Sequence, residues 1–246
     1  MAPIILLFIA LFILVFTWYK EPRIFLFLFH KVVFPTRRGK ALNIDKSVHF
    51  PESTILENSW KVICQELEAV ISNIRPLPKF HEVDKSNHKI SFDNGPAWRT
   101  LVLKAYDGWF TNNCKLFPET FRLLKGMPAA TTIMFSILEP CAKIPSHTGK
   151  FSGIWRYHLA LVVPSVHGCY LEVNGEKYFW REGEGILFND TFLHSVTNNS
   201  DGYRIVLFLD IKKRASFVVQ LTSNFILSLI RLSPVFKRAL KAGVIN

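Results

Sequence analysis

The sequence has few cysteines and few acidic residues. Its 4 cysteines are scattered without C-x-x-C spacing, which excludes a zinc knuckle and a dithiol redox motif. Cysteines placed in this way suit a reducing compartment and the role of buried structural thiols. The chain also lacks internal repeats and low-complexity tracts, so its 246 residues predict a single domain with one core and a short accessory segment.

Acidic residues are outnumbered, because 19 Asp and Glu stand against 30 Lys and Arg, for a formal net charge of +11. Such a balance suits either nucleic acid or an anionic membrane surface. The basic residues gather mainly near the two ends of the chain and form no patch interleaved with stacking aromatics. Nucleic acid is therefore not an expected partner.

Residues 3–19 contain no charge at all. At ~1.5 Å per residue, a helix of this stretch is about 25 Å long, enough for a thin or locally adapted bilayer. The stretch lacks a basic start and a small-residue cleavage site, so it predicts a retained transmembrane helix and not a signal peptide. Basic residues follow the span, and the positive-inside rule then predicts a single-pass membrane protein with the bulk of its chain, including the folded domain, on the cytoplasmic side.

Four segments are expected along the chain. Residues 1–34 combine the anchor with a short interfacial stretch, and residues 35–57 form a polar connector broken by Pro and Gly. Residues 58–212 form the folded domain. Residues 213–246 predict basic amphipathic helices that favour an anionic membrane surface, with a terminal helix packed on the domain as the alternative.

The folded domain is mainly β by its pattern. Helices are expected at residues 58–72 and 118–125, the second ending at Gly126. Short runs of Val, Ile, Leu, Phe and Tyr between turn signals fill residues 131–210, and Asn174-Gly175 marks the clearest hairpin. The pattern predicts a sandwich or small barrel.

Polar side chains interrupt two of the apolar β stretches. Arg156 and His158 are two residues apart and therefore share one face of a strand, where burial costs free energy unless they share an anion or a metal. His147 lies before them, across a Gly-containing segment that could return it to the same place. His194 is expected at the end of one strand and Arg204 early in the next, side by side across the turn between them.

Four stretches of this sequence resemble the aspartyl/asparaginyl β-hydroxylase family: MFSILEPCAKIPSHTG, WRYHLALVVP, GEKYFWREGEGILFNDTFLHSVTNNS and YRIVLFLD. The family includes membrane-anchored hydroxylases of lipid A acyl chains. The resemblance covers residues 58–212 and implies a double-stranded β-helix, a jelly-roll and cupin-like fold, with flanking helices.

The resemblance also implies a role for six residues. His147 and His194 would be ligands of Fe(II), because neutral imidazoles suit iron and leave positions open for co-substrate and O2. Arg204 and Ser136 would hold one carboxylate of 2-oxoglutarate, for which the planar fork of arginine is suited. Arg156 and His158 would support this co-substrate.

The sequence departs from the usual pattern of such sites in two places. His147-Thr148-Gly149 lacks the carboxylate of an H-x-D or H-x-E motif. The protein-hydroxylating branch of the family resembles this chain here, with glycine and water completing the iron shell, whereas the lipid branch more often keeps an acidic residue. Asn189-Asp190 stands where the family often has two aspartates, and Asp190 is expected to cap backbone amides in a turn.

The leading hypothesis is an Fe(II)/2-oxoglutarate-dependent dioxygenase that hydroxylates an acyl chain of a membrane lipid similar to lipid A. One alternative is the same chemistry on an Asp or Asn side chain of a protein. Another is a non-catalytic cupin-like binding module, because the missing carboxylate could mean lost redox activity. Trp98 is interpreted as a core residue or a wall of the substrate channel, and four further histidines as solvated: His49, His81, His88 and His167.

Overall fold

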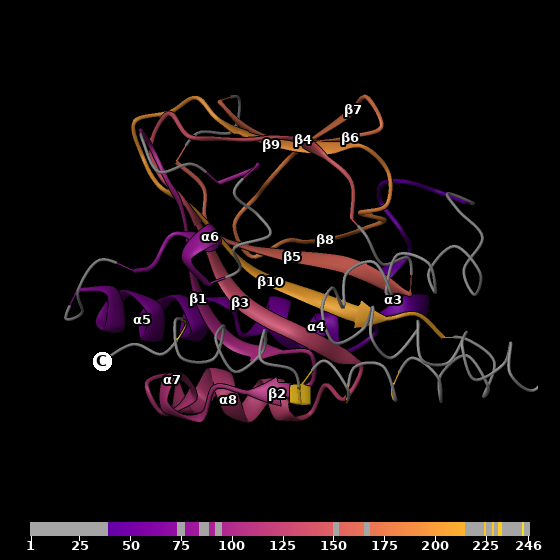
Figure 1. The fold of residues 1–246 in the computed structure, drawn as a ribbon. Coiled ribbons are helices and arrows are strands. Elements are labelled where there is room, and N and C mark those ends of the chain that lie inside the picture. Colours follow the sequence, from indigo (N-terminus) through magenta and orange to yellow (C-terminus); the bar gives the residue numbers. More distant parts are fainter. Residues whose placement is uncertain are drawn as a thin grey trace, which may run out of the picture.

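The computed structural model describes residues 39–72, 77–83, 89–91, 95–149, 153–164 and 168–214, together with Asn224, Ser228, Arg231, Leu232 and Gly243. In this part of the chain, antiparallel strands form two sheets that lie face to face (Figure 1). The larger sheet has the order β2 (Gly108–Trp109), β1 (Trp98–Ala105), β3 (Ala130–Leu138), β10 (Arg204–Lys212), β5 (Ile154–Val162) and β8 (Gly185–Phe188). The smaller sheet has the order β4 (Lys143–His147), β9 (His194–Asn198), β6 (Cys169–Val173) and β7 (Glu176–Phe179).

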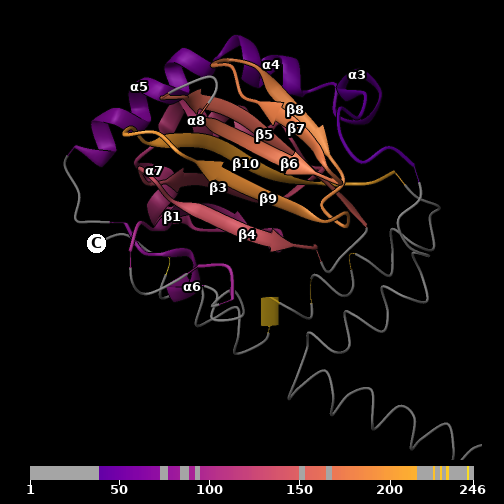
Figure 2. The same ribbon diagram turned by 90° about the horizontal axis from the view of Figure 1, so that it is seen from above.

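The last eight strands wind through both sheets. Strands β3, β10, β5 and β8 are neighbours in one sheet and β4, β9, β6 and β7 in the other (Figure 2). The chain therefore changes sheet between successive strands, except at the hairpin of β6 and β7. This is a double-stranded β-helix of the jelly-roll type. The predicted fold class is confirmed for the described residues.

The larger sheet separates two hydrophobic cores, and β10 shows how. Val206 and Phe208 belong to the core between the two sheets, whereas Leu207 and Leu209 belong to the core beneath the larger sheet. Successive side chains of a strand point to opposite faces, so this near-continuous apolar strand can serve both cores. Polar residues on the inner face of β5 and β10 are thereby placed between the sheets.

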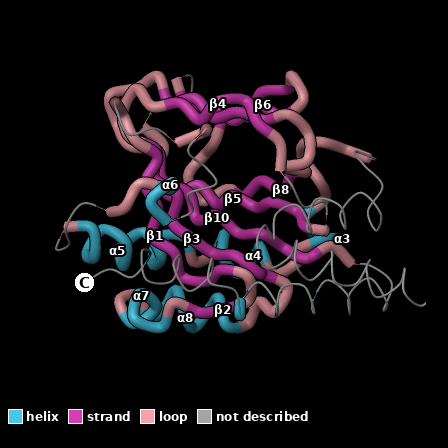
Figure 3. Tube along the Cα trace, viewed as in Figure 1, coloured by secondary structure: helices cyan, strands magenta, loops and turns pink. Residues whose placement is uncertain are grey.

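The helices of the described residues are α3 Lys46–His49, α4 Ser53–Asn58, α5 Trp60–Ile71, α6 Phe80–Val83, α7 Thr111–Lys115 and α8 Pro118–Lys125. Helices α4, α5, α7 and α8 cover the outer face of the larger sheet (Figures 1 and 3), whereas α6 packs against the core between the two sheets. Ile63 and Leu67 of α5 are buried one helical turn apart. The Glu66 carboxylate accepts hydrogen bonds from the backbone N–H groups of Glu119 and Thr120 at 2.8 Å each. This contact stabilises the first turn of α8 and fixes it against α5.

Several local predictions are confirmed. The helix α8 spans the predicted residues, with Pro118 in its first turn and Gly126 after its end. The turn Asn174-Gly175 joins β6 and β7, and both residues have positive φ, 53° and 85°. Such angles define the tight hairpin turn that Asn-Gly favours.

The connector prediction is wrong for residues 41–57. The Ile44 N–H donates to the Leu187 carbonyl and the Asn189 N–H donates to the Ala41 carbonyl, both at 2.9 Å, so this segment runs along β8. Phe50 and Leu56 are buried in the core beneath the sheet. The segment therefore belongs to the folded domain.

The cysteine prediction holds for three of the four residues. Cys64, Cys114 and Cys169 are buried free thiols, whereas Cys141 is exposed. Burial raises the pKa of Cys64 and of Cys114 to about 11, so both stay protonated and unreactive.

No helix among the described residues is long and apolar enough to cross a bilayer. The expected anchor, residues 1–34, and most of the expected C-terminal amphipathic helices lie outside the described residues.

Candidate metal and co-substrate site

All six residues singled out in the sequence line one pocket between the two sheets: Ser136, His147, Arg156, His158, His194 and Arg204. The smaller sheet supplies His147 and His194, here called the outer histidines, and the larger sheet supplies the other four residues. The remaining wall is apolar or aromatic and consists of Trp98, Ile144, Leu171, Phe188, Val196 and Phe208. A few convergent polar groups in an apolar cleft are typical of a small-molecule site.

The two outer histidines face each other at one end of the smaller sheet. His147 ends β4 and His194 begins β9, and the two residues are paired in register. Their ring centroids are 4.1 Å apart. Nδ1 of His147 bonds to the Pro145 carbonyl at 2.7 Å, and Nδ1 of His194 to the Phe192 carbonyl at 2.9 Å.

A carbonyl oxygen only accepts hydrogen bonds, so each Nδ1 must carry the proton. Each Nε2 of the neutral ring then keeps its lone pair, which is the form that binds a metal. Burial lowers the pKa of His147, and burial together with His147 and Arg156 lowers the pKa of His194 to about 3. Both imidazoles are therefore neutral at physiological pH.

The structure brings no third ligand to the histidines. Among the described residues, no group of three His, Cys, Asp or Glu side chains is placed to hold a metal ion. This agrees with the glycine of the His147-Thr148-Gly149 sequence. Two neutral imidazole nitrogens fit a borderline metal such as Fe(II) and leave its other positions to water, co-substrate or oxygen.

Arg204 lies at the opposite end of the pocket and is only 1% exposed. Its Nη1 contacts the carbonyl and the hydroxyl of Ser136 at 3.4 Å, and its guanidinium lies over the Trp180 ring. Its Nε and Nη2 have no hydrogen-bond partner. These two N–H groups form one edge of the guanidinium, the edge that binds a carboxylate through two parallel hydrogen bonds.

His158 is a second buried group without partners, since neither ring nitrogen has one. Burial, together with Arg204 and Arg156, lowers its pKa well below the usual value. It is therefore a neutral imidazole. Nearby, Trp98 donates from Nε1 to the Ser136 hydroxyl at 2.9 Å, so Ser136 can give its own proton to a ligand. Buried polar groups without partners are rare in native proteins, and here Arg204 and His158 line the same pocket.

Arg156 differs from Arg204 because its charge is already compensated. Its Nη2 lies 2.9 Å from the Asp190 carboxylate, and its Nε lies 3.0 Å from that of Asp210. Burial opposes the charge on Arg156, but Asp190 and Asp210 together raise its pKa. Burial raises the pKa of Asp210 to about 6, although Arg156 acts in the opposite direction. Arg156 lines the pocket, yet Arg204 is the better carboxylate anchor.

Asp190 is the functional residue that the sequence reasoning missed. Its side chain caps no amide: it is 1% exposed and pairs with Arg156. Its backbone carbonyl accepts from the Gly149 N–H at 2.7 Å. A Cβ at Gly149 would collide with the Asp190 carboxylate. Gly149 is therefore required by Asp190, whose carboxylate fills the space that a side chain at position 149 would need.

We expect Gly149→Ala to lower the free energy of unfolding by about 1–3 kcal/mol, because the added methyl overpacks against Asp190. The same substitution in an Asp190→Ala background should cost much less. Thermal unfolding of the four members of this cycle measures the coupling. Equal costs in the two backgrounds would contradict the assigned contact.

Two further expectations are wrong. His194 begins its strand, and Arg204 lies in the other sheet, paired with Leu138, so the two residues are not side by side across a turn. Both residues line the pocket only because each sheet contributes one of its walls. His81 is not solvated, since it is 2% exposed and its Nδ1 lies 2.9 Å from the Ser91 hydroxyl. His49 is partly covered by the Trp155 ring, and His88 and His167 lie outside the described residues.

The fold and the pocket define a jelly-roll domain with a two-histidine site and an unpaired buried arginine. The family model described as Aspartyl/Asparaginyl beta-hydroxylase matches residues 57–214. The chain belongs to this family.

Curated relatives include enzymes with different substrates. An ornithine lipid ester-linked acyl 2-hydroxylase of Rhizobium tropici is 31% identical over 192 residues, which cover 78% of this chain and 68% of that protein. The human aspartyl/asparaginyl beta-hydroxylase is 30% identical over 161 residues, which cover 63% of this chain and 20% of that protein. This chain therefore spans about a fifth of the human relative.

Solved structures with related folds are more distant. A 2OG-Fe(II) oxygenase family oxidoreductase from Burkholderia pseudomallei has a TM-score of 0.39 and 13% identity, covering 51% of this chain and 71% of that chain. A Cupin 2 conserved barrel protein from Salinispora arenicola has a TM-score of 0.33 and 15% identity, covering 62% of this chain and 97% of that chain. Scores this low support no assignment of activity.

Proposed function

We propose that this hydroxylase-family protein uses Fe(II), 2-oxoglutarate and O2 to hydroxylate an acyl chain of a membrane lipid similar to lipid A. One observation carries the proposal. Two neutral imidazoles with free Nε2 atoms share a pocket with a buried guanidinium edge that has no partner. Metal ligands and a carboxylate anchor in one apolar pocket are the two elements that this chemistry needs.

His147 and His194 would hold the iron, and no protein carboxylate would join them. With both bound, Fe(II) and 2-oxoglutarate supply the oxidation of an unactivated C–H bond by O2, with succinate and CO2 as co-products. The protein contributes position and electrostatics. The carbonyls of Pro145 and Phe192 fix the tautomer and orientation of the two rings.

Arg204 would bind the remote carboxylate of 2-oxoglutarate through Nε and Nη2, and the Ser136 hydroxyl would donate to the same group. His158 lies between Arg204 and the outer histidines along the inner face of the larger sheet, where it can donate one hydrogen bond to the bound dicarboxylate. The aromatic and aliphatic wall excludes water from the reacting centre. Arg156 is fixed by its ion pairs with Asp190 and Asp210 and would keep this part of the pocket wall rigid.

The membrane lipid is favoured as substrate by three observations. A curated relative whose match covers 78% of this chain acts on an acyl chain of a lipid, as its name states. The sequence begins with a long uncharged apolar stretch, and its net charge is +11. An anchored basic protein on the cytoplasmic side of an anionic membrane would meet its substrate at high effective concentration.

A protein side chain is the second candidate, and the Gly149 position favours it. The chain lacks the acidic residue after His147 that the lipid branch was expected to keep, and human aspartyl/asparaginyl beta-hydroxylase is among its relatives. Both substrates require the same residues at the iron and at 2-oxoglutarate. Only an activity assay with each kind of substrate can distinguish a lipid from a protein as the substrate.

Mass spectrometry of cellular lipids tests the proposal. We expect one class of lipid acyl chains to gain one oxygen atom when the full chain is expressed. A matched His147→Ala/His194→Ala chain should give no such gain. Succinate release in vitro should rise on adding the lipid extract. Succinate release with an Asp- or Asn-containing peptide, and none with any lipid extract, would transfer the assignment to a protein substrate.

A further inference from the structure

We infer that the end of the sandwich that carries His147 and His194, the histidine end, is the surface that docks on an anionic lipid bilayer. The inference rests on the proposed function for the nature of the substrate. Beyond that function, it specifies which face of the molecule contacts the membrane and how the pocket is oriented toward it. The other end of the sandwich, which carries Cys141, Lys143 and Asp201, is called the remote end.

The N-terminal segment joins the domain at the histidine end. Residues 1–38 precede the first described residue, Gly39. The Ala41 carbonyl accepts a hydrogen bond from the Asn189 N–H at 2.9 Å, and Asn189 is followed by Asp190, whose carbonyl binds Gly149. Gly149 follows His147 by two positions. An anchor placed before Gly39 would therefore hold this end of the domain toward the membrane.

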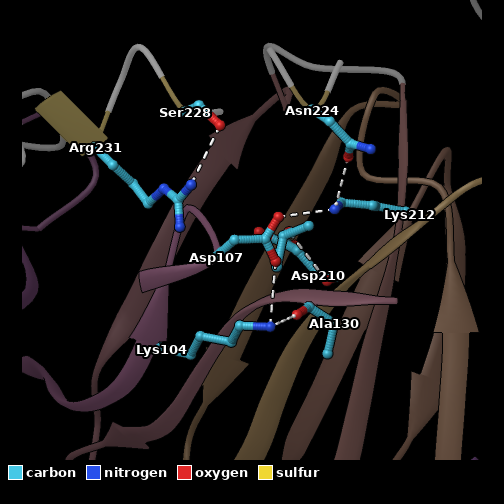
Figure 4. A network of polar contacts seen from close by, with 9 residues as sticks. Lys104, Asp107, Ala130, Asp210, Lys212, Asn224, Ser228 and Arg231 are labelled. Atoms are coloured by element: carbon cyan, nitrogen blue, oxygen red, sulfur yellow. Dashed lines mark hydrogen bonds and ion pairs between the residues drawn. The ribbon is translucent and has the colours of Figure 1, made fainter. Parts of the chain in front are cut away.

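The C-terminal segment leaves from the same end. Strand β10 ends at Lys212, opposite Ile154 at the start of β5, and the Lys213 N–H donates to the Gly153 carbonyl at 2.8 Å. Gly153 closes the segment that begins at Gly149. Lys212 in turn binds Asp107 at 2.7 Å and the side chain of Asn224 at 2.9 Å, which places Asn224 next to this end (Figure 4).

The surface between these two exits is apolar and basic. Leu193, next to His194, is 53% exposed. Lys40 and Arg214 are exposed, and the Lys213 ammonium lies over the Trp155 ring. No described carboxylate forms an ion pair with these three cations. Exposed cations around an apolar tip complement a bilayer with anionic headgroups.

The remote end has a different character. Cys141 and Asp201 are exposed there, beside the turn that joins β9 to β10. Lys143, at the start of β4, is an exposed cation on the same strand as His147 but four residues away, about 13 Å along an extended strand. Lys143 therefore provides a control cation at the end of β4 that is remote from His147.

Docking at the histidine end would give an acyl chain a direct path. His147 and Arg156 are the two lining residues that are partly exposed, so the pocket reaches the surface beside them, and most of its other lining residues are aliphatic or aromatic. A chain that leaves the bilayer next to Leu193 would reach the histidines without crossing the charged surface. Arg204, at the deep end, would remain out of contact with lipid and available to the dicarboxylate.

Quenching of a fluorophore by spin-labelled lipid tests the orientation. The full chain is placed in vesicles of phosphatidylcholine and phosphatidylglycerol that contain headgroup spin labels. One preparation is labelled at native Cys141, and a second at Leu193→Cys in a Cys141→Ser background, since the other three cysteines are buried. We expect quenching at position 193 to be several-fold stronger than at position 141. Equal quenching, or stronger quenching at Cys141, would overturn the inference.

Charge variants test the role of the cations. Arg214→Glu, which leaves the contact between Lys213 and Trp155 intact, should weaken quenching at position 193, and Lys213→Glu/Arg214→Glu should weaken it further. Lys143→Glu should leave it unchanged. An equal loss with Lys143→Glu would show that only total charge matters and would contradict the assigned face.

Quenching is measured without iron or turnover, so the two proposals can fail separately. A chain that docks by the histidine end but oxidises no lipid refutes the proposed function alone. A chain that hydroxylates lipid while Cys141 is quenched more strongly refutes the docking face alone.

Discussion

Replacing both His147 and His194 with alanine is expected to abolish Fe(II) binding and turnover. The two imidazoles are the only His side chains of the described pocket with a carbonyl on Nδ1 and a free Nε2. Among the residues that the structure describes, no third ligand is placed to compensate. Each single variant keeps one imidazole and should bind iron at least 10-fold more weakly, because a metal held by two protein ligands loses half of them. Calorimetric titration with Fe(II) under anaerobic conditions measures both effects.

His49→Ala is the control for this experiment. His49 is a partly exposed imidazole of α3 that packs on Trp155, outside the pocket, so its loss should leave iron affinity unchanged. The double variant should stay folded, because both lost rings are neutral and make only short-range hydrogen bonds to carbonyls. Undiminished iron binding by the folded double variant would place the metal elsewhere.

Local patterns in the sequence predicted the larger part of the site. The two-residue spacing of Arg156 and His158 places both side chains on the inner face of β5, as expected for a strand. The Asn174-Gly175 hairpin and the Pro118 start of α8 also follow from local chemistry. These features depend on residues close in sequence, where backbone geometry and turn preferences decide the outcome.

Contacts between distant segments were not predictable in the same way. Asp190 follows β8 and Arg156 lies in β5, and their ion pair forms only when these strands become neighbours. A turn position suggested a capping role for Asp190, but burial beside a guanidinium determines its actual role. The one signal in the sequence was Gly149, whose missing side chain leaves the space that Asp190 fills.

Residues 41–57 show why composition misleads at the border of a domain. Their charged and turn-forming residues indicated a connector, yet several of the apolar side chains among them are buried in the two cores. Leu42, Phe50 and Leu56 are each no more than 2% exposed. Polar residues on the outer side of the same segment, such as Asp45, obscured this pattern. A half-buried edge segment carries too weak a periodicity to be recognised without its partner strand.

Arg204→Met should have opposite effects on co-substrate binding and on stability. Methionine has a similar length and fills the same space without charge or donors. The loss of a charge-assisted carboxylate pair, about 1.5–3 kcal/mol, should raise the Kd of 2-oxoglutarate roughly 10- to 150-fold. Arg181→Met, at a side chain that is 73% exposed, is the matched control and should change neither quantity.

The thermal stability of the ligand-free chain should rise with the same substitution, Arg204→Met. Burial lowers the pKa of Arg204 to about 10, so the folded state disfavours the charged form at every pH below this value. The difference from the usual pKa corresponds to a cost of about 3 kcal/mol at neutral pH. Removing an uncompensated buried charge relieves this cost, and the ligand-free Arg204→Met chain should unfold at a higher temperature than the native chain. Added 2-oxoglutarate should stabilise the native chain alone, because only Arg204 gives the dicarboxylate a counter-charge. A lower unfolding temperature with unchanged 2-oxoglutarate affinity would show that the guanidinium serves the fold and not the co-substrate.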